Sequence, residues 1–153
     1  SILLFNKYLK AKKMNTNDKI AQDAYSLVGG HPLYLMAIAE SWDGKQQIAD
    51  VFQNLLTNTL GTLKLYCEYL LSEDLGTIIR GPMLRTILRA ISEHDQGLSY
   101  SELSKKISNP INKLPRYVKP LIGADLIEQK EGKFVIRDKI LQEYLKIEAK
   151  ELF

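Results

Sequence analysis

The chain has 153 residues, of which 45% are apolar and 25% charged, and it carries a net charge of +3. That length and apolar content suffice for one compact domain or two small ones. A single cysteine excludes an internal disulfide, no apolar run reaches membrane-spanning length, and lysines interrupt the N-terminal apolar stretch that a signal peptide would need. We therefore expect a cytoplasmic protein with no membrane partner.

Charge is unevenly distributed along the sequence. Residues 1–13 hold four lysines and no acid, residues 14–98 hold six basic and ten acidic side chains, and residues 99–139 hold nine basic and five acidic ones. The excess of positive charge in the last block is mild for a nucleic-acid binder, but it lies where an element that reads a groove is expected.

A glycine pair and a proline separate the first two predicted elements. Apolar residues recur at helical spacing from residue 20 to residue 28, and Gly29 and Gly30 follow, where a positive-φ cap ends a helix. Pro32 then suits the first turn of a second helix, because its fixed φ is helical and its missing N–H needs no partner there. The spacing alone predicts a tight corner between two packed helices.

Residues 29–35, Gly-Gly-His-Pro-Leu-Tyr-Leu, resemble the corner that follows the nucleotide-binding core in the lid subdomain of archaeal ATPases of the AAA+/STAND group. NB-ARC proteins carry a similar Gly-Leu-Pro-Leu motif, and the resemblance covers about residues 1–45. It implies that Pro32, with Gly30 and His31 beside it, approaches the adenine of a bound nucleotide. The alternative for the histidine is simple solvation at a surface turn.

The sequence contains no phosphate-binding loop. Such a loop needs Gly-x-x-x-x-Gly-Lys-[Ser/Thr] to hold phosphates with backbone N–H groups, and a strand-end aspartate to hold the metal. Gly76 and Gly81 have the right spacing, but Pro82 follows them. We expect no ATP hydrolysis and no cofactor in this chain alone. The resemblance implies ATP or ADP with magnesium in a parent protein, whose N-terminal ATPase core is then a missing partner, and the opening on Ser1 without methionine agrees with a fragment.

The middle of the chain is predicted to be helical. Apolar residues repeat at intervals of three and four over residues 48–71, with Thr59 and Leu60 in the apolar stripe, and Gly61 is a point at which this long helix can divide. Cys67 lies among leucines, which predicts a core thiol. The polar, glycine and proline residues that follow predict a boundary between two domains. These domains are residues 1–79 and residues 80–153.

The remaining segment predicts three helices and a hairpin. The helices come from apolar spacing over residues 83–91, from a start at residues 98–103, and from apolar spacing over residues 114–122. Ser99 and Glu102 have the spacing of a capping box. Pro115 suits the first turn of the third helix, whereas Pro120 lies deeper and should kink or shorten it. Strand, turn and strand are predicted at residues 126–129, 130–133 and 134–136.

This order of elements resembles the winged helix-turn-helix superfamily over about residues 82–138. Residues 123–127, Gly-Ala-Asp-Leu-Ile, are similar to the exit from its third helix, and residues 137–145 are similar to the Asp and apolar helix that often follow the wing. Archaeal ATPases of the group named above commonly place such a domain directly after the lid. The predicted fold class is mainly α: a helical lid subdomain followed by a winged helix-turn-helix domain with a small β-hairpin wing and a C-terminal helix.

A winged helix on double-stranded DNA places its third helix in the major groove. Arg116 is the expected base contact, because its planar fork reaches a guanine edge, and the lysines are expected to meet phosphates. The predicted DNA-binding residues are Lys113, Arg116, Tyr117 and Lys119 on or near the third helix, and Lys130 and Lys133 at the wing tip.

Three functions fit these observations. The first is the regulatory C-terminal part of an archaeal-type ATPase, with a nucleotide-sensing lid and a DNA-binding winged helix. The second uses the winged helix to dock a protein partner, and the third is a free-standing helical transcription regulator in which the corner is only a turn. We expect no catalytic or metal site, because His31 and His94 lie in different predicted domains without ligand spacing to Cys67, and solvation explains the pair Glu73 and Asp74.

Overall fold

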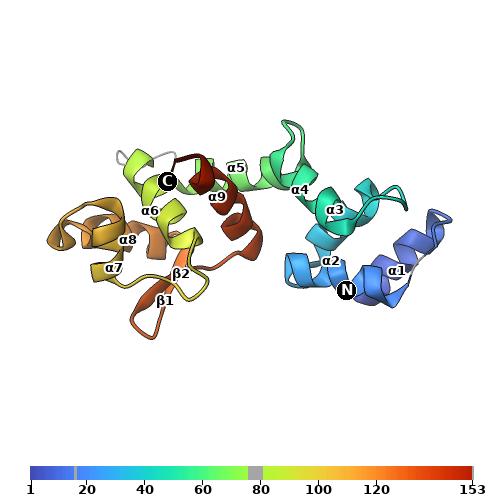
Figure 1. The fold of residues 1–153 in the computed structure, drawn as a ribbon, viewed down its shortest axis with the longest axis horizontal. Helices are drawn as coiled ribbons and strands as arrows, with labels where there is room; N and C mark the ends of the chain where they lie inside the picture. Colours follow the sequence, from blue (N-terminus) through green and yellow to red (C-terminus); the bar gives the residue numbers. More distant parts are fainter. Residues whose placement is uncertain (16, 76–80, 153) are drawn as a thin grey trace. The chain divides into compact units, whose positions relative to one another are not determined.

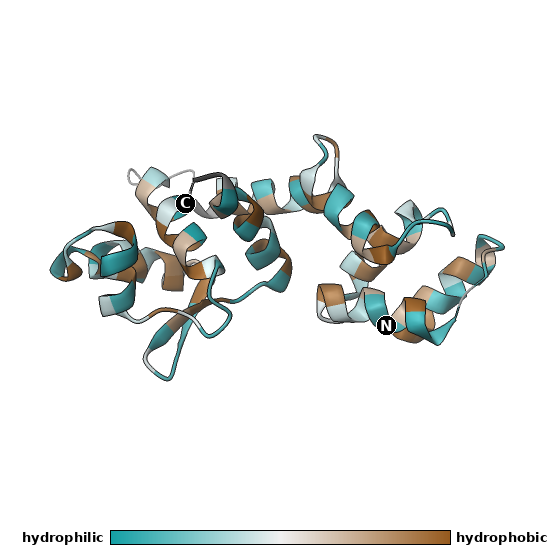
Figure 2. Cartoon of the chain, in the orientation of Figure 1, coloured by the Kyte–Doolittle hydropathy of each residue, from teal (hydrophilic) through white to brown (hydrophobic). Residues whose placement is uncertain are grey.

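A computed structural model describes residues 1–15, 17–75 and 81–152, and Figure 1 shows its course. The predicted domain boundary at residues 79 and 80, and Gly76, lie outside the described residues. The described chain is mainly helical with one two-stranded antiparallel sheet. It forms two compact units, Ser1–Tyr66 (unit 1) and Cys67–Phe153 (unit 2), each with its own core. Brown and teal segments alternate along the helices of both units, as amphipathic packing requires (Figure 2).

Unit 1 is a set of short helices around an apolar core. Its elements are α1 (Ile2–Ala11), α2 (Asp18–Val28), α3 (Pro32–Ser41), α4 (Ile48–Thr57) and the beginning of α5 (Thr62–Leu75). Helices α1 and α2 both pack on α3, and α4 packs on α2 and α3. Phe5, Ile38, Phe52 and Leu56 are buried where these helices meet. The predicted pair of helices on either side of the glycine pair is confirmed.

The predicted long helix divides before Gly61, in agreement with the sequence. Helix α4 ends at Thr57, with Asn58 as its C-cap. A Cβ atom on Gly61 would lie 2.4 Å from the carbonyl oxygen of Leu55, so the connecting turn has no room for a side chain there. The expectation that Leu60 continues the apolar stripe is wrong: its side chain is 84% exposed, because the turn removes it from the helix face. Cys67 is buried as predicted, and burial raises the pKa of its thiol.

Unit 2 contains three helices, a hairpin and a long last helix. After the end of α5 it comprises α6 (Gly81–Ser92), α7 (Tyr100–Ile107), the 3₁₀ turn η1 (Ile111–Lys113), α8 (Pro115–Gly123), β1 (Ile127–Lys130), β2 (Lys133–Ile136) and α9 (Lys139–Leu152). Helix α6 lies at the centre and contacts α7, α8, β2 and α9. Its buried residues Leu84, Ile87, Leu88 and Ile91 form the middle of the core.

Local signals in unit 2 were accurate to about one residue. Both bonds of the predicted capping box are present, from the Glu102 N–H to Ser99 Oγ at 3.2 Å and from the Ser99 N–H to Glu102 Oε1 at 3.4 Å. Pro115 begins α8 as predicted, and the helix continues through Pro120 to Gly123. The strands each begin and end within one residue of the predicted limits.

No helix within the described ranges has both the length and the apolar character needed to cross a bilayer.

Candidate functional site

The corner between α2 and α3 has the predicted geometry. Gly29 and Gly30 adopt φ values of +66° and +79°, and the Gly30 N–H donates to the carbonyl oxygen of Tyr25 at 3.2 Å. Pro32 begins α3, and the Leu35 N–H donates to the His31 carbonyl oxygen at 3.1 Å. His31 and Pro32 are exposed, so the corner presents both residues to solvent.

A side chain at Gly30 would meet the Tyr25 ring as well as an unfavourable backbone angle. A Cβ atom at this position would lie 2.6 Å from ring atoms of Tyr25, which covers the corner. A side chain cannot enter that space unless the tyrosine ring moves. The aromatic ring of α2 therefore helps to fix the conformation from which His31 and Pro32 project.

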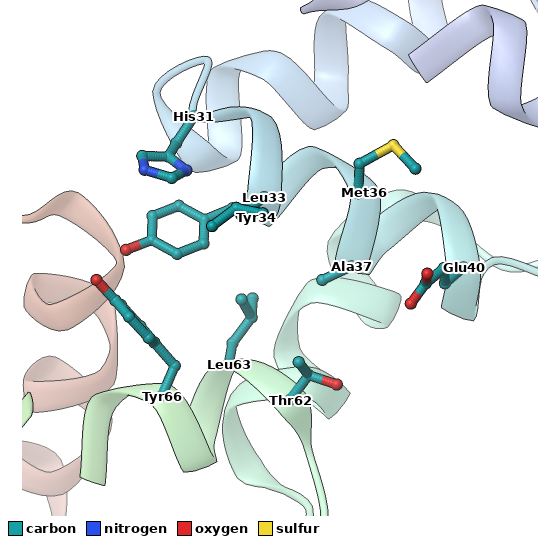
Figure 3. A pocket seen from close by; sticks show the side chains of 9 residues that line it. All are labelled: His31, Leu33, Tyr34, Met36, Ala37, Glu40, Thr62, Leu63 and Tyr66. Carbon is teal, nitrogen blue, oxygen red and sulfur yellow. The ribbon is translucent and has the colours of Figure 1, made fainter. Parts of the chain in front are cut away.

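An apolar pocket of about 390 Å³ lies beside this corner, between α3 and the beginning of α5 (Figure 3). The His31 and Tyr34 rings stack with centroids 4.2 Å apart, and the Tyr34 and Tyr66 rings meet edge to face at 5.3 Å. The pocket is lined by His31, Leu33, Tyr34, Met36, Ala37, Glu40, Thr62, Leu63 and Tyr66. His31 is thus part of the wall, whereas Gly30 and Pro32 are not.

The wall of this pocket suits a flat or apolar group. Leu63 and the two tyrosines project toward the space between the helices, and Glu40 lies toward the far end (Figure 3). Among the described residues that line it there is no lysine or arginine to hold a phosphate. The pocket can therefore take a ring or an aliphatic side chain, and a phosphate group would have to be held elsewhere.

Sequence reasoning singled out Tyr34 as part of the corner motif, but it placed Tyr66 only in an apolar stripe. The two rings come together because the beginning of α5, more than thirty residues later in the chain, lies across the pocket from α3. A helical stripe predicts which side of a helix is buried and does not predict its partner. The signal available was only the aromatic character of Tyr66.

The second candidate surface is the exposed face of α8. Arg116 and Lys119 lie one turn apart and are exposed, while Val118 and Leu121 on the opposite side are fully buried. The Arg116 guanidinium lies 5.3 Å from the Tyr117 ring centroid, within the range of a cation–π contact. Lys113 is exposed in η1, one turn before α8, so the third helix itself does not carry it.

The hairpin places Lys130 and Lys133 opposite each other, beside the two-residue turn. Both lysines make ion pairs: Lys130 Nζ lies 3.0 Å from Glu128 Oε1, and Lys133 Nζ lies 3.4 Å from Glu102 Oε1. Sequence reasoning missed both acidic partners. The spacing of Glu128 and Lys130, two apart on one face of a strand, was a usable signal, whereas nothing local connects Glu102 on α7 with the hairpin.

A cluster of charged side chains, which the sequence did not reveal, joins α5, α6 and α9. Glu148 accepts hydrogen bonds from Arg85 and from Arg89 Nε, the latter at 2.9 Å, and Arg85 Nη2 also lies 3.1 Å from Glu68 Oε1. Tyr144 donates its hydroxyl to Glu68. Burial disfavours the charged carboxylate of Glu148, but the two arginines outweigh burial and hold the pKa of Glu148 below its ordinary value.

The two histidines lie apart from each other and from any cluster of metal-type ligands in the described residues. Within the described residues no three His, Cys, Asp or Glu side chains converge as a metal site would require. His31 lies in unit 1, stacked on Tyr34, and His94 lies in unit 2, where its Nε2 is 3.1 Å from Lys106 Nζ.

Comparison with known proteins gives a match at the level of structure. No protein-family model matches the sequence, and no curated protein sequence matches it. A solved structure of a Walker-type ATPase from Pyrococcus abyssi superposes with a TM-score of 0.74 at 16% sequence identity, over 95% of this chain and 41% of that chain. The two proteins therefore share a fold over nearly all of this chain, which spans less than half the length of the ATPase.

Proposed function

We propose that this chain is the C-terminal regulatory part of an archaeal-type ATPase, in which unit 1 is the lid that senses nucleotide and unit 2 is a winged helix that binds double-stranded DNA. One observation carries the second half of this proposal. Leu98, in the loop between α6 and α7, exchanges backbone hydrogen bonds with Phe134 of β2, at 3.0 Å and 2.8 Å. Strand-like pairing before the second helix, with a hairpin after the third, supports the assignment of unit 2 as a winged helix.

The lid half of the proposal is supported by the corner and by the structural comparison. The corner at residues 29–32 holds His31 and Pro32 at the surface, next to a pocket whose walls fit a planar ring. The fold shared with a Walker-type ATPase, over 41% of the length of that protein, supports a role as one part of a larger ATPase. A separate core would supply the phosphate loop, with ATP or ADP and magnesium, and this chain alone would not hydrolyse ATP.

DNA is favoured as the partner of unit 2 because positive charge gathers on its helices. Residues 103–124, which run from α7 through α8, contain five basic residues and no acidic one. A convex helix face with exposed Arg116 and Lys119 fits the width of a major groove and its flanking phosphates.

The test is an anisotropy titration of labelled duplex DNA across a salt series. Arg116→Glu/Lys119→Glu is compared with Lys7→Glu/Lys10→Glu, which makes the same charge change on exposed residues of α1 in unit 1. We expect salt-dependent binding by the wild type and by the α1 variant, with a loss of tenfold or more in the α8 variant. Equal binding by all three proteins would contradict a DNA-binding role for α8.

Protein docking by unit 2 is the second candidate. It is favoured by the exposure of Ile111 and Ile122, which are 50% and 38% exposed beside the basic face, and by the ion pairs of the hairpin lysines. Apolar residues of this kind are more useful in contact with a protein than with phosphates. Absence of duplex binding by the wild type, even at low salt, would favour this candidate.

A further inference from the structure

We propose that unit 2 contacts double-stranded DNA through one basic segment, residues 103–124, and that its β-hairpin takes no part in phosphate binding because its own carboxylates already hold its cations. The inference rests on the proposed function and specifies which surface performs it. It departs from the sequence expectation, in which Lys130 and Lys133 meet phosphates.

Among the residues that the structure describes, no carboxylate lies within 4.0 Å of four exposed cations of the basic segment. In the described part of the chain, the ion pairs closer than 4.0 Å do not involve Lys105, Lys113, Arg116 or Lys119. The remaining lysine of the segment, Lys106, pairs with Glu93 at 3.0 Å. A cation that has no carboxylate partner can exchange its bound water and counterions for a phosphate without breaking an ion pair.

The hairpin and its two flanking turns have the opposite character. Each of the three basic residues Lys130, Lys133 and Arg137 lies within 3.4 Å of a carboxylate, from Glu128, Glu102 and Asp125 respectively. Residues 125–138 contain four acidic and three basic residues, and Glu131 is exposed in the turn. The hairpin therefore offers a phosphate no surplus of positive charge.

Replacement of a carboxylate partner by a phosphate at the hairpin would contribute little binding free energy. A phosphate that captured Lys133 would replace one anion by another and would leave Glu102 beside the DNA backbone, where like charges repel. Glu102 is also held in place by the capping box, since it accepts the Ser99 N–H at 3.4 Å. Its position near Lys133 is therefore fixed by the start of α7 and not only by the ion pair.

The basic segment also has a spacing that suits a nucleic-acid strand. Lys113, Arg116 and Lys119 follow one another at intervals of three residues through η1 and α8, so their side chains leave from one side. With rises of about 1.5–2.0 Å per residue, the row extends roughly 10 Å along the axis. Duplex DNA presents several phosphates over such a length, because the phosphates of each strand lie about 3.4 Å apart along the helix axis.

The experiment compares two variants that remove the same charge from the same unit: Lys113→Gln/Lys119→Gln in the basic segment and Lys130→Gln/Lys133→Gln in the hairpin. Kd for a labelled random duplex is measured by anisotropy at several salt concentrations, and far-UV circular dichroism checks the fold of each variant. We expect the basic-segment variant to bind about tenfold or more weakly and to lose about two units of salt slope, one for each phosphate contact. The hairpin variant should stay within about threefold of the wild type, with an unchanged slope.

Each outcome bears on the inference. Equal weakening by both variants, or a larger loss in the hairpin variant, would overturn it while leaving DNA binding by unit 2 intact. Failure of the wild type to bind duplex at low salt would overturn the proposed function and this inference together. A basic-segment variant that folds normally and binds as tightly as the wild type would overturn the inference alone.

Discussion

Two constraints act on Gly30, and they can be separated by substitution. Its φ of +79° lies in the left-handed region, and the Tyr25 ring occupies the space of a side chain. Gly44 shares the first constraint, with φ of +84°, but a Cβ there meets only the terminal methyl of Met14 at 3.0 Å, which can move. Both glycines lie in unit 1, so the fluorescence of the buried Trp42 monitors the unfolding of both variants.

Gly44→Ala should therefore lower the free energy of unfolding by about 1 kcal/mol, the cost of the left-handed backbone. Gly30→Ala should cost about 2–4 kcal/mol, because displacement of the Tyr25 ring adds to that cost. Urea unfolding followed by Trp42 fluorescence measures both. The double variant Tyr25→Ala/Gly30→Ala should lose less free energy of unfolding than the sum of the losses in the two single variants. Equal costs for the two glycine variants would mean that the ring yields freely.

At the scale of elements, Glu148 ties α9 to α6 through two arginines. It accepts hydrogen bonds from Arg85 and Arg89 of α6, and Arg85 extends the cluster to Glu68 of α5. The side chain of Glu148 is only 17% exposed, so loss of its charge leaves two arginines without their shared carboxylate in a partly buried site. Glu148→Gln should destabilise unit 2 by about 1–3 kcal/mol at neutral pH.

The pH dependence of this effect has a definite sign. Because the folded-state pKa of Glu148 lies below the ordinary value of 4.5, its contribution is present above that value and is lost as the pH falls through the lower folded pKa. The difference between wild type and Glu148→Gln should accordingly shrink in acid. Glu128→Gln, which removes the exposed ion pair with Lys130, should cost less than about 1 kcal/mol at neutral pH. A constant difference between wild type and Glu148→Gln from pH 7 to pH 3 would contradict the assignment.

Elements could be predicted from the sequence where their signals are local. The glycine pair, Pro115 and the Ser99–Glu102 spacing each act within about four residues, and the helix ends they predicted are present. The partners of a surface charge are set by the packing of distant elements, so the pair formed by Lys133 and Glu102 and the cluster around Glu148 had no counterpart in the sequence. For the candidate site, the corner was predictable and its aromatic pocket was not.

For the molecule as a whole, the two units provide two cores and two natural probes. The lone tryptophan, Trp42, is buried in unit 1, and the lone cysteine, Cys67, is buried in unit 2. Burial raises the pKa of the Cys67 thiol, so the folded unit holds it in the unreactive protonated form. Trp42 fluorescence therefore reports on unit 1, and labelling of Cys67 by a thiol reagent reports on the opening of unit 2.

A matched pair of core substitutions tests whether these cores are separate in energy as well as in structure. Ile38 in α3 and Ile87 in α6 are both fully buried, one in each unit. Replacement of either by alanine should cost about 2–5 kcal/mol in its own unit, from lost burial and the cavity left behind. Ile38→Ala should lower the urea midpoint of Trp42 fluorescence more than Ile87→Ala does. Ile87→Ala should accelerate Cys67 labelling more than Ile38→Ala does. Equal shifts of both probes in both variants would show one cooperative unfolding transition, in which the lid and the winged helix of the proposed function lose structure together.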